Sequence, residues 1–366
     1  MNLLPLHEFH QTIGAVFGEV NGAEAVLHYG DWRREHAALR ESAAVIDLSF
    51  RSRLCLVGAD RAKFLHGQVT HDVNALAAGQ GCYAALVNAK GRMQSDLQIW
   101  NLADELLLDF EPGLAGEVAA RLEKYIVSDD VQLADAAPHY GLISVQGAKA
   151  GEILTRLCLG VELPAQPLRF VGVNDATLGQ LYLMNQPRMG VAGFDLFAPA
   201  ASLGVVADKL IAAAKPLGGR AAGWQALETA RIEAGIPRYG ADMDETTLPP
   251  EAGLEARMMS YRKGCYIGQE VLNRLHTMGH VNRELRGLQL AGDLHELPMR
   301  GDKLFKEGKE TGRVTSAAFS PALSANVALG YVRREWLAVG TELLLETKNG
   351  SSSAWVAELP FVKGQA

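Results

Sequence analysis

The segment KGCYIGQEVLNRLHTMGH (263–280) holds a thiol, an amine, carboxyl and amide groups and two imidazoles within eighteen residues. Its thiol, Cys265, falls in a predicted loop. The ammonium group of Lys263 and the free N–H groups of a helix that starts near Gly268 would both favour the thiolate form of Cys265. The pattern therefore indicates a nucleophilic or redox thiol, although a structural cysteine is the commoner outcome for such a residue.

The remaining cysteines and the two histidines of this segment do not indicate a metal site. Cys55 and Cys82 fall in predicted strands and Cys158 in a predicted helix, where a thiol is usually a small buried apolar group. The four cysteines form no C-x-x-C pair, so structural zinc is not expected. His276 and His280 have helical i, i+4 spacing, but the H-E-x-x-H pattern of zinc hydrolases is missing. We expect solvated imidazoles and no metal.

A second concentration of charge lies in ALETARIEAGIPRYGADMD (226–244), at the end of a predicted amphipathic helix. Arg231 and Glu233 lie near this helix end, which Gly235 and Pro237 define. Charged residues there often form surface ion pairs that contribute about 0 to 1 kcal/mol each. The alternative is that Arg231 holds a planar or anionic ligand with its fork of N–H donors.

Apolar periodicity and breakers predict an α+β fold. Asp31 caps a helix over 31–44, and the turn AKGR joins two strands, 82–88 and 96–102, into a hairpin. Further strands are predicted over 53–58, 106–110, 139–147, 180–184 and 194–197, and further helices over 113–127, 148–160, 203–214 and 223–236. After residue 283 the sequence pattern changes to short apolar segments separated by Gly and Pro, which is typical of a small antiparallel β-barrel. We place the boundary there: 1–283 forms an α+β region of two interleaved subdomains, and 284–366 forms the barrel.

Length and charge restrict the class of protein. A chain of 366 residues exceeds one ordinary core, and its composition, 48% hydrophobic and 21% charged, is that of a globular protein. A net charge of −7 argues against direct nucleic-acid binding, because nucleic-acid binders concentrate Lys and Arg. No apolar run reaches the about 18 residues of a membrane helix, so we expect no membrane partner and a cytoplasmic location with free thiols.

Three segments resemble the folate-dependent aminomethyltransferases, the T-proteins of the glycine cleavage system (the GcvT superfamily). They are EHAALRESAAVIDLS (35–49), ARIEAGIPRYGADMD (230–244) and PPEAGL (249–254), and the resemblance extends over nearly the whole chain. Within that superfamily, GQVTHDV (67–73), NAKGRMQSDL (88–97) and above all KGCYIGQE (263–270) are similar to the YgfZ branch.

The resemblance implies three modules around a central cavity that binds tetrahydrofolate or a derivative. It also implies that Cys265 and Lys263 form the functional pair of the octapeptide KGCYIGQE (263–270). Gln269 and Glu270 then shape this loop. The resemblance also implies that four residues face the folate: Arg51, Arg231, Glu233 and Tyr239.

Two departures from the T-protein pattern bear on activity. The paired aspartates of T-proteins read Ser95-Asp96 here, so Asp96 is the one carboxylate of the catalytic pair that remains. The segment MGVAGFDLF (189–197) lacks the glutamate that engages the pterin ring in T-proteins, and a site that loses a hydrogen-bonding partner discriminates poorly.

From these features we expect a folate-binding accessory protein, not an aminomethyltransferase of the usual kind. Its YgfZ-like role would be to support assembly or repair of iron–sulfur clusters, with an indirect effect on cluster-dependent tRNA modification. The resemblance implies iron–sulfur client enzymes or assembly factors as partners. One cysteine cannot supply the about four ligands of a cluster, so a bound cluster would be shared with another chain or with small thiols. The alternative is a folate-dependent aminomethyl or one-carbon transferase, and a third hypothesis is a scaffold that binds no folate.

Overall fold

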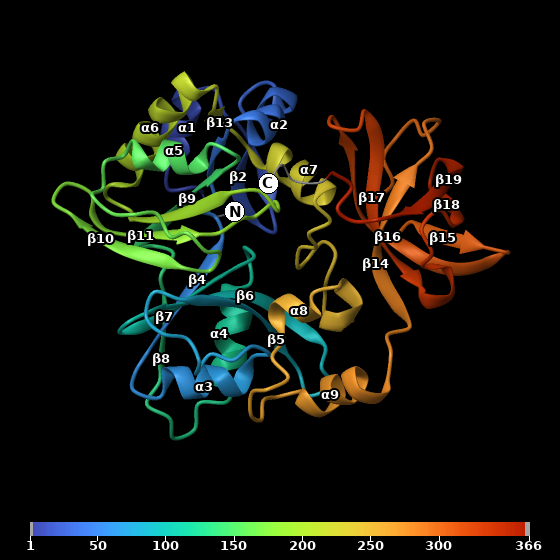
Figure 1. Cartoon of the computed structure of the whole chain (residues 1–366), viewed down its shortest axis with the longest axis horizontal. Coiled ribbons are helices and arrows are strands. Elements are labelled where there is room, and N and C mark those ends of the chain that lie inside the picture. Colours follow the sequence, from blue (N-terminus) through green and yellow to red (C-terminus); the bar gives the residue numbers. More distant parts are fainter. Residues whose placement is uncertain (1–2, 363–366) are drawn as a thin grey trace.

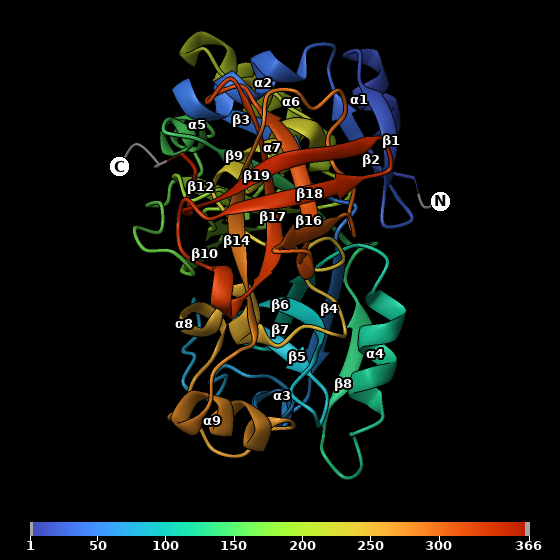
Figure 2. The same cartoon turned by 90° about the vertical axis from the view of Figure 1, so that its right-hand side faces the viewer.

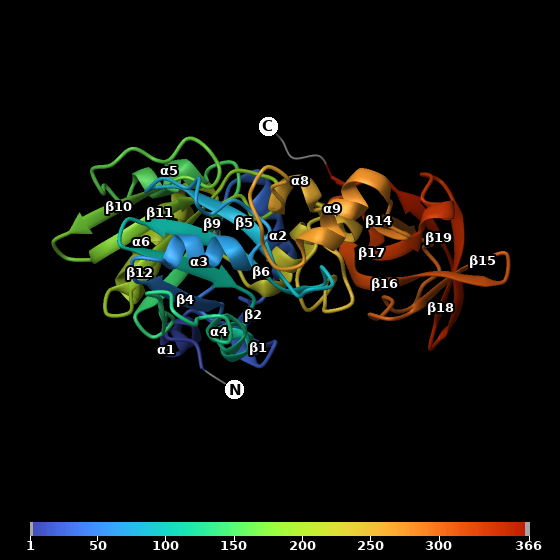
Figure 3. The same cartoon turned by 90° about the horizontal axis from the view of Figure 1, so that it is seen from below.

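The computed structural model describes residues 3–362, which form three modules (Figure 1). The first is built on a six-stranded sheet, the second on a five-stranded sheet, and the third is a closed barrel. The chain contributes β3 (Ala44–Asp47) to the first sheet, builds the second sheet, and returns to the first sheet with β9 (Tyr140–Gln146). The first two modules therefore interleave in sequence, and the barrel follows them at one end of the long axis (Figures 1 and 3).

The six-stranded sheet has buried side chains on both faces. Its strand order is β10-β11-β12-β9-β3-β13, and neighbours are antiparallel except for the parallel pair β3 and β13. Val45 and Ile143 face one apolar cluster with α5 and α6, whereas Ile46 and Leu142 face the other with α2 and α7. The additional bounds are β10 (Phe170–Asp175), β11 (Gly179–Asn185), β12 (Gly193–Pro199), β13 (Arg220–Ala221), α1 (His7–Thr12), β1 (Val16–Val20), β2 (Ala23–His28), α2 (Trp32–Glu41), α5 (Ala150–Thr155), α6 (Leu203–Ala214), the 3-10 turn η1 (Lys215–Leu217) and α7 (Trp224–Glu233).

The five-stranded antiparallel sheet has the order β5-β6-β7-β4-β8 and is also covered on both faces. Along β5 (Gly81–Val87), Cys82, Ala84 and Leu86 pack against α3, while the intervening side chains pack with α8 and α9. This two-sided burial explains why the strand reads as the continuous apolar run CYAALV. The other elements are β4 (Ser52–Val57), α3 (Arg61–Gln68), β6 (Met93–Leu102), β7 (Glu105–Phe110), α4 (Ala115–Glu123), β8 (Gln132–Asp135), the 3-10 turn η2 (Pro249–Ala252), α8 (Glu255–Met258) and α9 (Gln269–Met278).

The third module is a closed antiparallel barrel of order β14-β17-β16-β15-β18-β19, in which β14 pairs with both β17 and β19. Ile232 of α7 packs on its outer wall with Leu329 and Tyr331, and Figure 2 shows the barrel in front of the junction between the other two modules. Its elements are β14 (Arg283–Leu290), β15 (Lys303–Lys306), β16 (Lys309–Ser320), β17 (Ala325–Arg333), the 3-10 turn η3 (Arg334–Trp336), β18 (Glu342–Thr347) and β19 (Gly350–Ala357). The predicted α+β fold with a C-terminal antiparallel barrel is confirmed.

One predicted helix is shorter than expected, and this changes the environment of a cysteine. The helix predicted over 148–160 ends at Thr155, and Cys158 lies beyond it with a φ of 55°. That left-handed conformation cannot continue an α-helix. The Cys158 thiol is exposed, and not buried as predicted. Among residues 3–362, the structure contains no helix with the length and hydropathy that a membrane span requires.

Candidate active site

A cavity with about 800 Å³ of empty space, part of it open to solvent, lies where the two sheets and α7 meet. Trp224, Leu227 and Pro237 contribute apolar parts of its wall. Its polar lining comprises Arg51, Tyr83, Asp96, Gln98, Asp109, Glu111, Gln186, Arg188, Glu228, Arg231, Arg238 and Arg257. Leu48, Pro187, Ile236 and Leu254 complete the lining.

The carboxyl group of Asp96, on β6, is the most unusual acid in this cavity. The phenol of Tyr83 on the neighbouring strand donates a hydrogen bond to Asp96 Oδ2 over 2.7 Å, and Oδ1 is buried without a hydrogen-bond partner among the described residues. Burial, reinforced by the carboxylate of Glu111, raises the pKa of Asp96 to about 6, although Tyr83 and Arg51 oppose the shift. An acid that titrates near neutral pH and keeps one oxygen free can exchange a proton with a bound molecule.

The acids beside Asp96 are held ionised by arginines. Arg51 donates to Asp109 over 2.9 Å and to Glu111 over 2.7 Å, while Arg188 also reaches Asp109 and Arg238 also reaches Glu111. Burial opposes ionisation of both acids, but the surrounding guanidiniums outweigh it and lower the pKa of Asp109 and of Glu111. The predicted ligand-facing residue Arg51 therefore lies at the cavity with its donors paired to protein carboxylates.

Arg231 also lines the cavity, as the sequence suggested, and its guanidinium is likewise engaged. It donates to Asp242 over 2.5 Å, to Ser316 Oγ of β16 over 2.7 Å, and to Glu228. The acids around it outweigh its burial and raise its pKa, so it stays a cation. Arg231 thus ties α7 to the barrel at the cavity wall, and its Nε remains buried without a partner among the described residues.

Two other predicted folate-facing residues do not line this cavity. The Glu233 carboxylate accepts hydrogen bonds from Ser320 over 2.5 Å and pairs with His36 Nε2 at 2.8 Å. Tyr239 is buried in the apolar cluster on the α8 side of the five-stranded sheet, and that burial raises its pKa. Glu233 therefore joins α2, α7 and the barrel. Tyr239 packs in the apolar cluster and does not line the cavity.

The octapeptide 263–270 packs against the five-stranded module, and its buried lysine acts as a structural clamp by binding three backbone carbonyls of that module. Lys263 is only 6% exposed, and its Nζ donates to the backbone carbonyls of His66, Val69 and His71 over 2.5, 2.7 and 2.9 Å. Burial lowers the pKa of Lys263 to about 8. Gly268 has a φ of 83°, and an added Cβ would lie 2.5 Å from a backbone oxygen of the β5–β6 turn. The lysine and the second glycine of the motif therefore fix this loop against the sheet.

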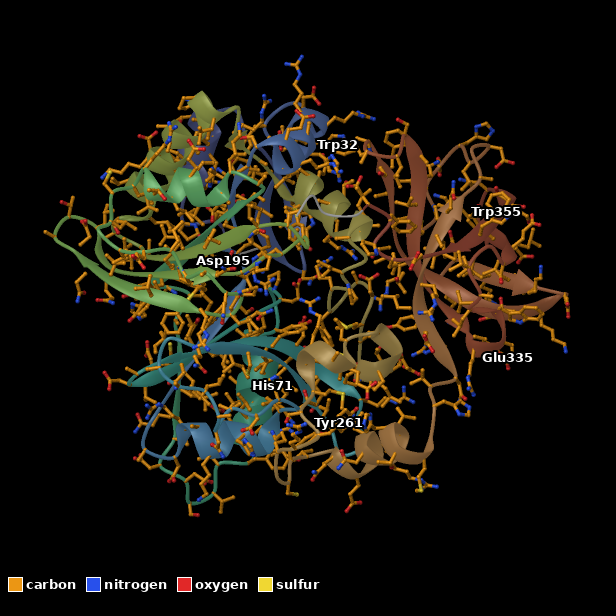
Figure 4. All side chains as sticks on the ribbon, in the orientation of Figure 1. Trp32, His71, Asp195, Tyr261, Glu335 and Trp355 are labelled. Carbon is orange, nitrogen blue, oxygen red and sulfur yellow. The ribbon has the colours of Figure 1, made fainter. Side chains whose placement is uncertain are left out.

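Three octapeptide residues lie away from the cavity: Cys265 is exposed, Gln269 is half-buried at the start of α9, and Glu270 is exposed. Figure 4 places His71, whose carbonyl receives Lys263, with Tyr261 in the five-stranded module, apart from Asp195 on the six-stranded sheet. Of the predicted catalytic residues, the structure brings Asp96 to the cavity and keeps Cys265 and Lys263 outside it.

The sequence analysis missed several residues of the cavity wall. Asp109 and Glu111 were detectable, because acids at the end of the apolar run LLLDFE contradict simple burial. Gln98 was detectable for the same reason, as an amide within LQIW. Gln186 and Arg188 follow β11 in a loop and carry no local signal of this kind.

Comparison with known proteins agrees with this architecture. Residues 6–262 match the family model described as the GCVT N-terminal domain, and residues 283–363 match the glycine cleavage T-protein C-terminal barrel domain. Two modules around a polar cavity, followed by this barrel, define the class, and the chain belongs to the GCVT family. The superfamily resemblance drawn from the sequence is therefore confirmed.

The relatives are similar over their full lengths. The aminomethyltransferase of Thermotoga neapolitana is 29% identical over 100% of this chain and 98% of its own. The aminomethyltransferase of Bacillus subtilis is 27% identical over 98% of each chain. The crystal structure of the glycine cleavage system aminomethyltransferase T from Bartonella henselae is 26% identical, has a TM-score of 0.87, and covers 100% of this chain and 99% of that chain.

These relatives overturn the expected iron–sulfur accessory function. They are named aminomethyltransferases, which favours the alternative hypothesis of a transferase, and they do not support the narrower assignment to the YgfZ branch. The structure supplies a physical reason for the error. The octapeptide that suggested that branch buries Lys263 as a structural clamp and leaves Cys265 exposed, outside the cavity.

Proposed function

We propose that this chain is an aminomethyltransferase that passes a one-carbon group to tetrahydrofolate in the cavity. The observation that carries the proposal is Asp96, whose Oδ1 is buried without a hydrogen-bond partner among the described residues and whose pKa is raised to about 6. The names of the full-length relatives support the same reaction class.

The cavity has the chemistry that a folate requires. The planar indole of Trp224 and the apolar side chain of Leu227 suit the faces of a planar ring, and polar atoms without partners among the described residues suit its hydrogen-bonding edges. Arg257 is an exposed cation of the wall for which the described residues provide no ion pair. It is suited to the carboxylates at the other end of a folate.

Asp96 supplies proton transfer in this proposal. When bound, tetrahydrofolate supplies the nucleophilic nitrogen. Asp96 Oδ1 accepts the proton of that nitrogen as the new nitrogen–carbon bond forms. The bond between the transferred carbon and the carrier protein breaks, and Asp96 returns the proton to the carrier. A second folate nitrogen then forms its bond to the same carbon, and the amino group leaves that carbon as ammonia, which completes methylene-tetrahydrofolate. Tyr83 orients the carboxyl throughout through its hydrogen bond to Oδ2.

The test is Asp96→Asn, assayed for methylene-tetrahydrofolate formed from an aminomethylated carrier protein. Because the amide cannot accept this proton, turnover is expected to fall at least about 100-fold, while calorimetry shows tetrahydrofolate affinity within a few-fold of the wild type. Asp104→Asn, at an exposed position of the β6–β7 turn, is the matched control and should keep full turnover. Full turnover of Asp96→Asn, or a wild type that binds no tetrahydrofolate, would overturn the proposal.

A further inference from the structure

We infer that two glutamine amides, Gln98 and Gln186, read the edge of the folate ring and set the ligand specificity of the cavity. The inference rests on the proposed function and adds to it the residues that select the ring. These side chains line the cavity from different modules: Gln98 lies on β6 of the five-stranded sheet, and Gln186 directly follows β11 of the six-stranded sheet.

Both amides are buried and unused within the protein. Gln98 is 9% exposed and Gln186 is 6% exposed, and each Oε1 is buried without a hydrogen-bond partner among the described residues. Most buried polar side-chain atoms in proteins have a partner, because an unpaired one costs about 1 to 3 kcal/mol. Two such atoms in the wall of one cavity therefore indicate a ligand that supplies the missing donors.

The backbone around each glutamine is fixed, so the free amide groups are held in place. Gln186 N donates to Gly193 O over 2.9 Å, and Gln186 O accepts a hydrogen bond from Gln146 Nε2 over 2.9 Å. Gln98 lies within the β5–β6–β7 ladder, opposite Tyr83 on one side and Asp109 on the other. A rigid backbone that presents an unpaired amide resembles a preorganised recognition site.

An amide offers one acceptor and two donors without charge, and this pattern matches the edge of a reduced pterin. The pyrimidinone edge of that ring presents N–H donors beside a carbonyl acceptor. The carboxylate next to this site on β12, Asp195, is not available to the ring, because it is bonded to Arg188 and to Ser144 Oγ. We therefore expect the ring to be recognised by neutral amides.

The experiment compares three probes by anaerobic calorimetry: tetrahydrofolate, 6-methyltetrahydropterin as the ring alone, and p-aminobenzoylglutamate as the tail alone. Gln98→Leu and Gln186→Leu are each expected to weaken tetrahydrofolate and the ring probe about ten-fold. The double variant should weaken them about 100-fold, and all three variants should bind the tail probe as the wild type does. Gln289→Leu, at an exposed position of β14, is the matched control and should change nothing.

A second substitution separates the hydrogen bond from loss of polarity or of folding. Gln98→Asn keeps the amide but withdraws it by one methylene, so it should lose ring affinity while its thermal unfolding midpoint stays that of the wild type. Wild-type ring affinity in the Leu variants, or a parallel loss of ring and tail binding, would overturn this inference alone. A wild type that binds neither tetrahydrofolate nor the ring probe would overturn the proposed function as well.

Discussion

At the scale of single residues, burial gives Asp96 a proton affinity that an exposed aspartate lacks. Arg51, Arg188 and Arg238 do not neutralise it, because they are engaged by Asp109 and Glu111 and hold those two acids ionised. One acid of the group therefore titrates about one pH unit below neutrality, while its neighbours stay charged. This separation of roles within one cluster is typical of acid–base sites.

The rate of transfer should follow the titration of Asp96. Its pKa of about 6 means that the base form is scarce below pH 6 and predominant above it. We expect kcat/KM to rise about ten-fold per pH unit up to pH 6 and to level off above it. Steady-state kinetics of the wild type between pH 5 and 8 measures this profile, and a rate that stays flat from pH 5 to 7 would contradict it.

The raised pKa of Asp96 also lowers the free energy of unfolding at neutral pH. Its folded pKa of about 6 exceeds the ordinary value of 3.8, so the folded state binds more protons than the unfolded state between these two values. The free energy of unfolding therefore falls as pH rises through that window and is constant above it. We expect Asp96→Asn to be more stable than the wild type at pH 7, by up to about 3 kcal/mol.

Urea denaturation at pH 7 and at pH 3.5 tests this prediction. The advantage of Asp96→Asn should appear at pH 7 and disappear at pH 3.5, where the wild-type carboxyl is protonated in both states. The exposed Asp104→Asn variant should show no such difference. Equal stability of Asp96→Asn and the wild type at pH 7 would show that burial does not raise the pKa of this acid.

At the scale of elements, the loop before α9 depends on a buried ammonium. Lys263 connects this loop to the end of α3 and the segment after it through three carbonyls. Replacing it with methionine fills similar space but leaves these carbonyls without their donor. We expect Lys263→Met to lose about 2 to 4 kcal/mol of unfolding free energy.

The neighbouring thiol provides the control for Lys263→Met. Cys265 is exposed and lies outside the cavity, so Cys265→Ala should stay within about 0.5 kcal/mol of the wild type and retain transferase turnover. Urea denaturation and the methylene-tetrahydrofolate assay measure both properties. Loss of turnover in a fully stable Cys265→Ala protein would show that the thiol takes part in the reaction.

Individual elements could be predicted from local pattern, but their contacts could not. The helix predicted over 203–214 is α6 with the same bounds, because its apolar spacing and its packing agree. The family resemblance assigned both Arg231 and Glu233 to the folate, yet positions two residues apart on a helix point about 200° apart. Lys263 could not be recognised as a clamp, because its carbonyl partners lie more than 190 residues earlier in the chain.

At the scale of the whole molecule, buried charges connect all three modules. A series of ion pairs starts at Asp195 on the six-stranded sheet and continues through Asp109 of β7 and Glu111, which directly follows β7. It then reaches α7 and ends at Asp242 against the barrel. The cavity lies along this path, so its shape depends on the docking of every module. In Figure 2 the barrel lies in front of the other two modules.

Asp242 is the joint between α7 and the barrel. Its carboxylate accepts hydrogen bonds from Arg231 over 2.5 Å and from the hydroxyls of Thr315 and Ser316 over 2.5 and 2.7 Å. Asp242→Ala would leave Arg231 buried with one of its two carboxylate partners removed. Because removing one partner of a buried ion pair is strongly destabilising, we expect a loss of about 3 to 5 kcal/mol.

The Asp242→Ala variant should also show whether Asp242 fixes the barrel against α7. In Asp242→Ala, limited proteolysis should cut faster between α7 and β14, and tetrahydrofolate affinity should fall even though Asp242 does not line the cavity. Asp208→Ala, at an exposed position of α6, removes a carboxylate without this joint and should match the wild type in both measurements. If Asp242→Ala lost stability but kept wild-type affinity and cleavage rate, the cavity would hold its shape without the barrel, and the ion path would contribute to stability alone.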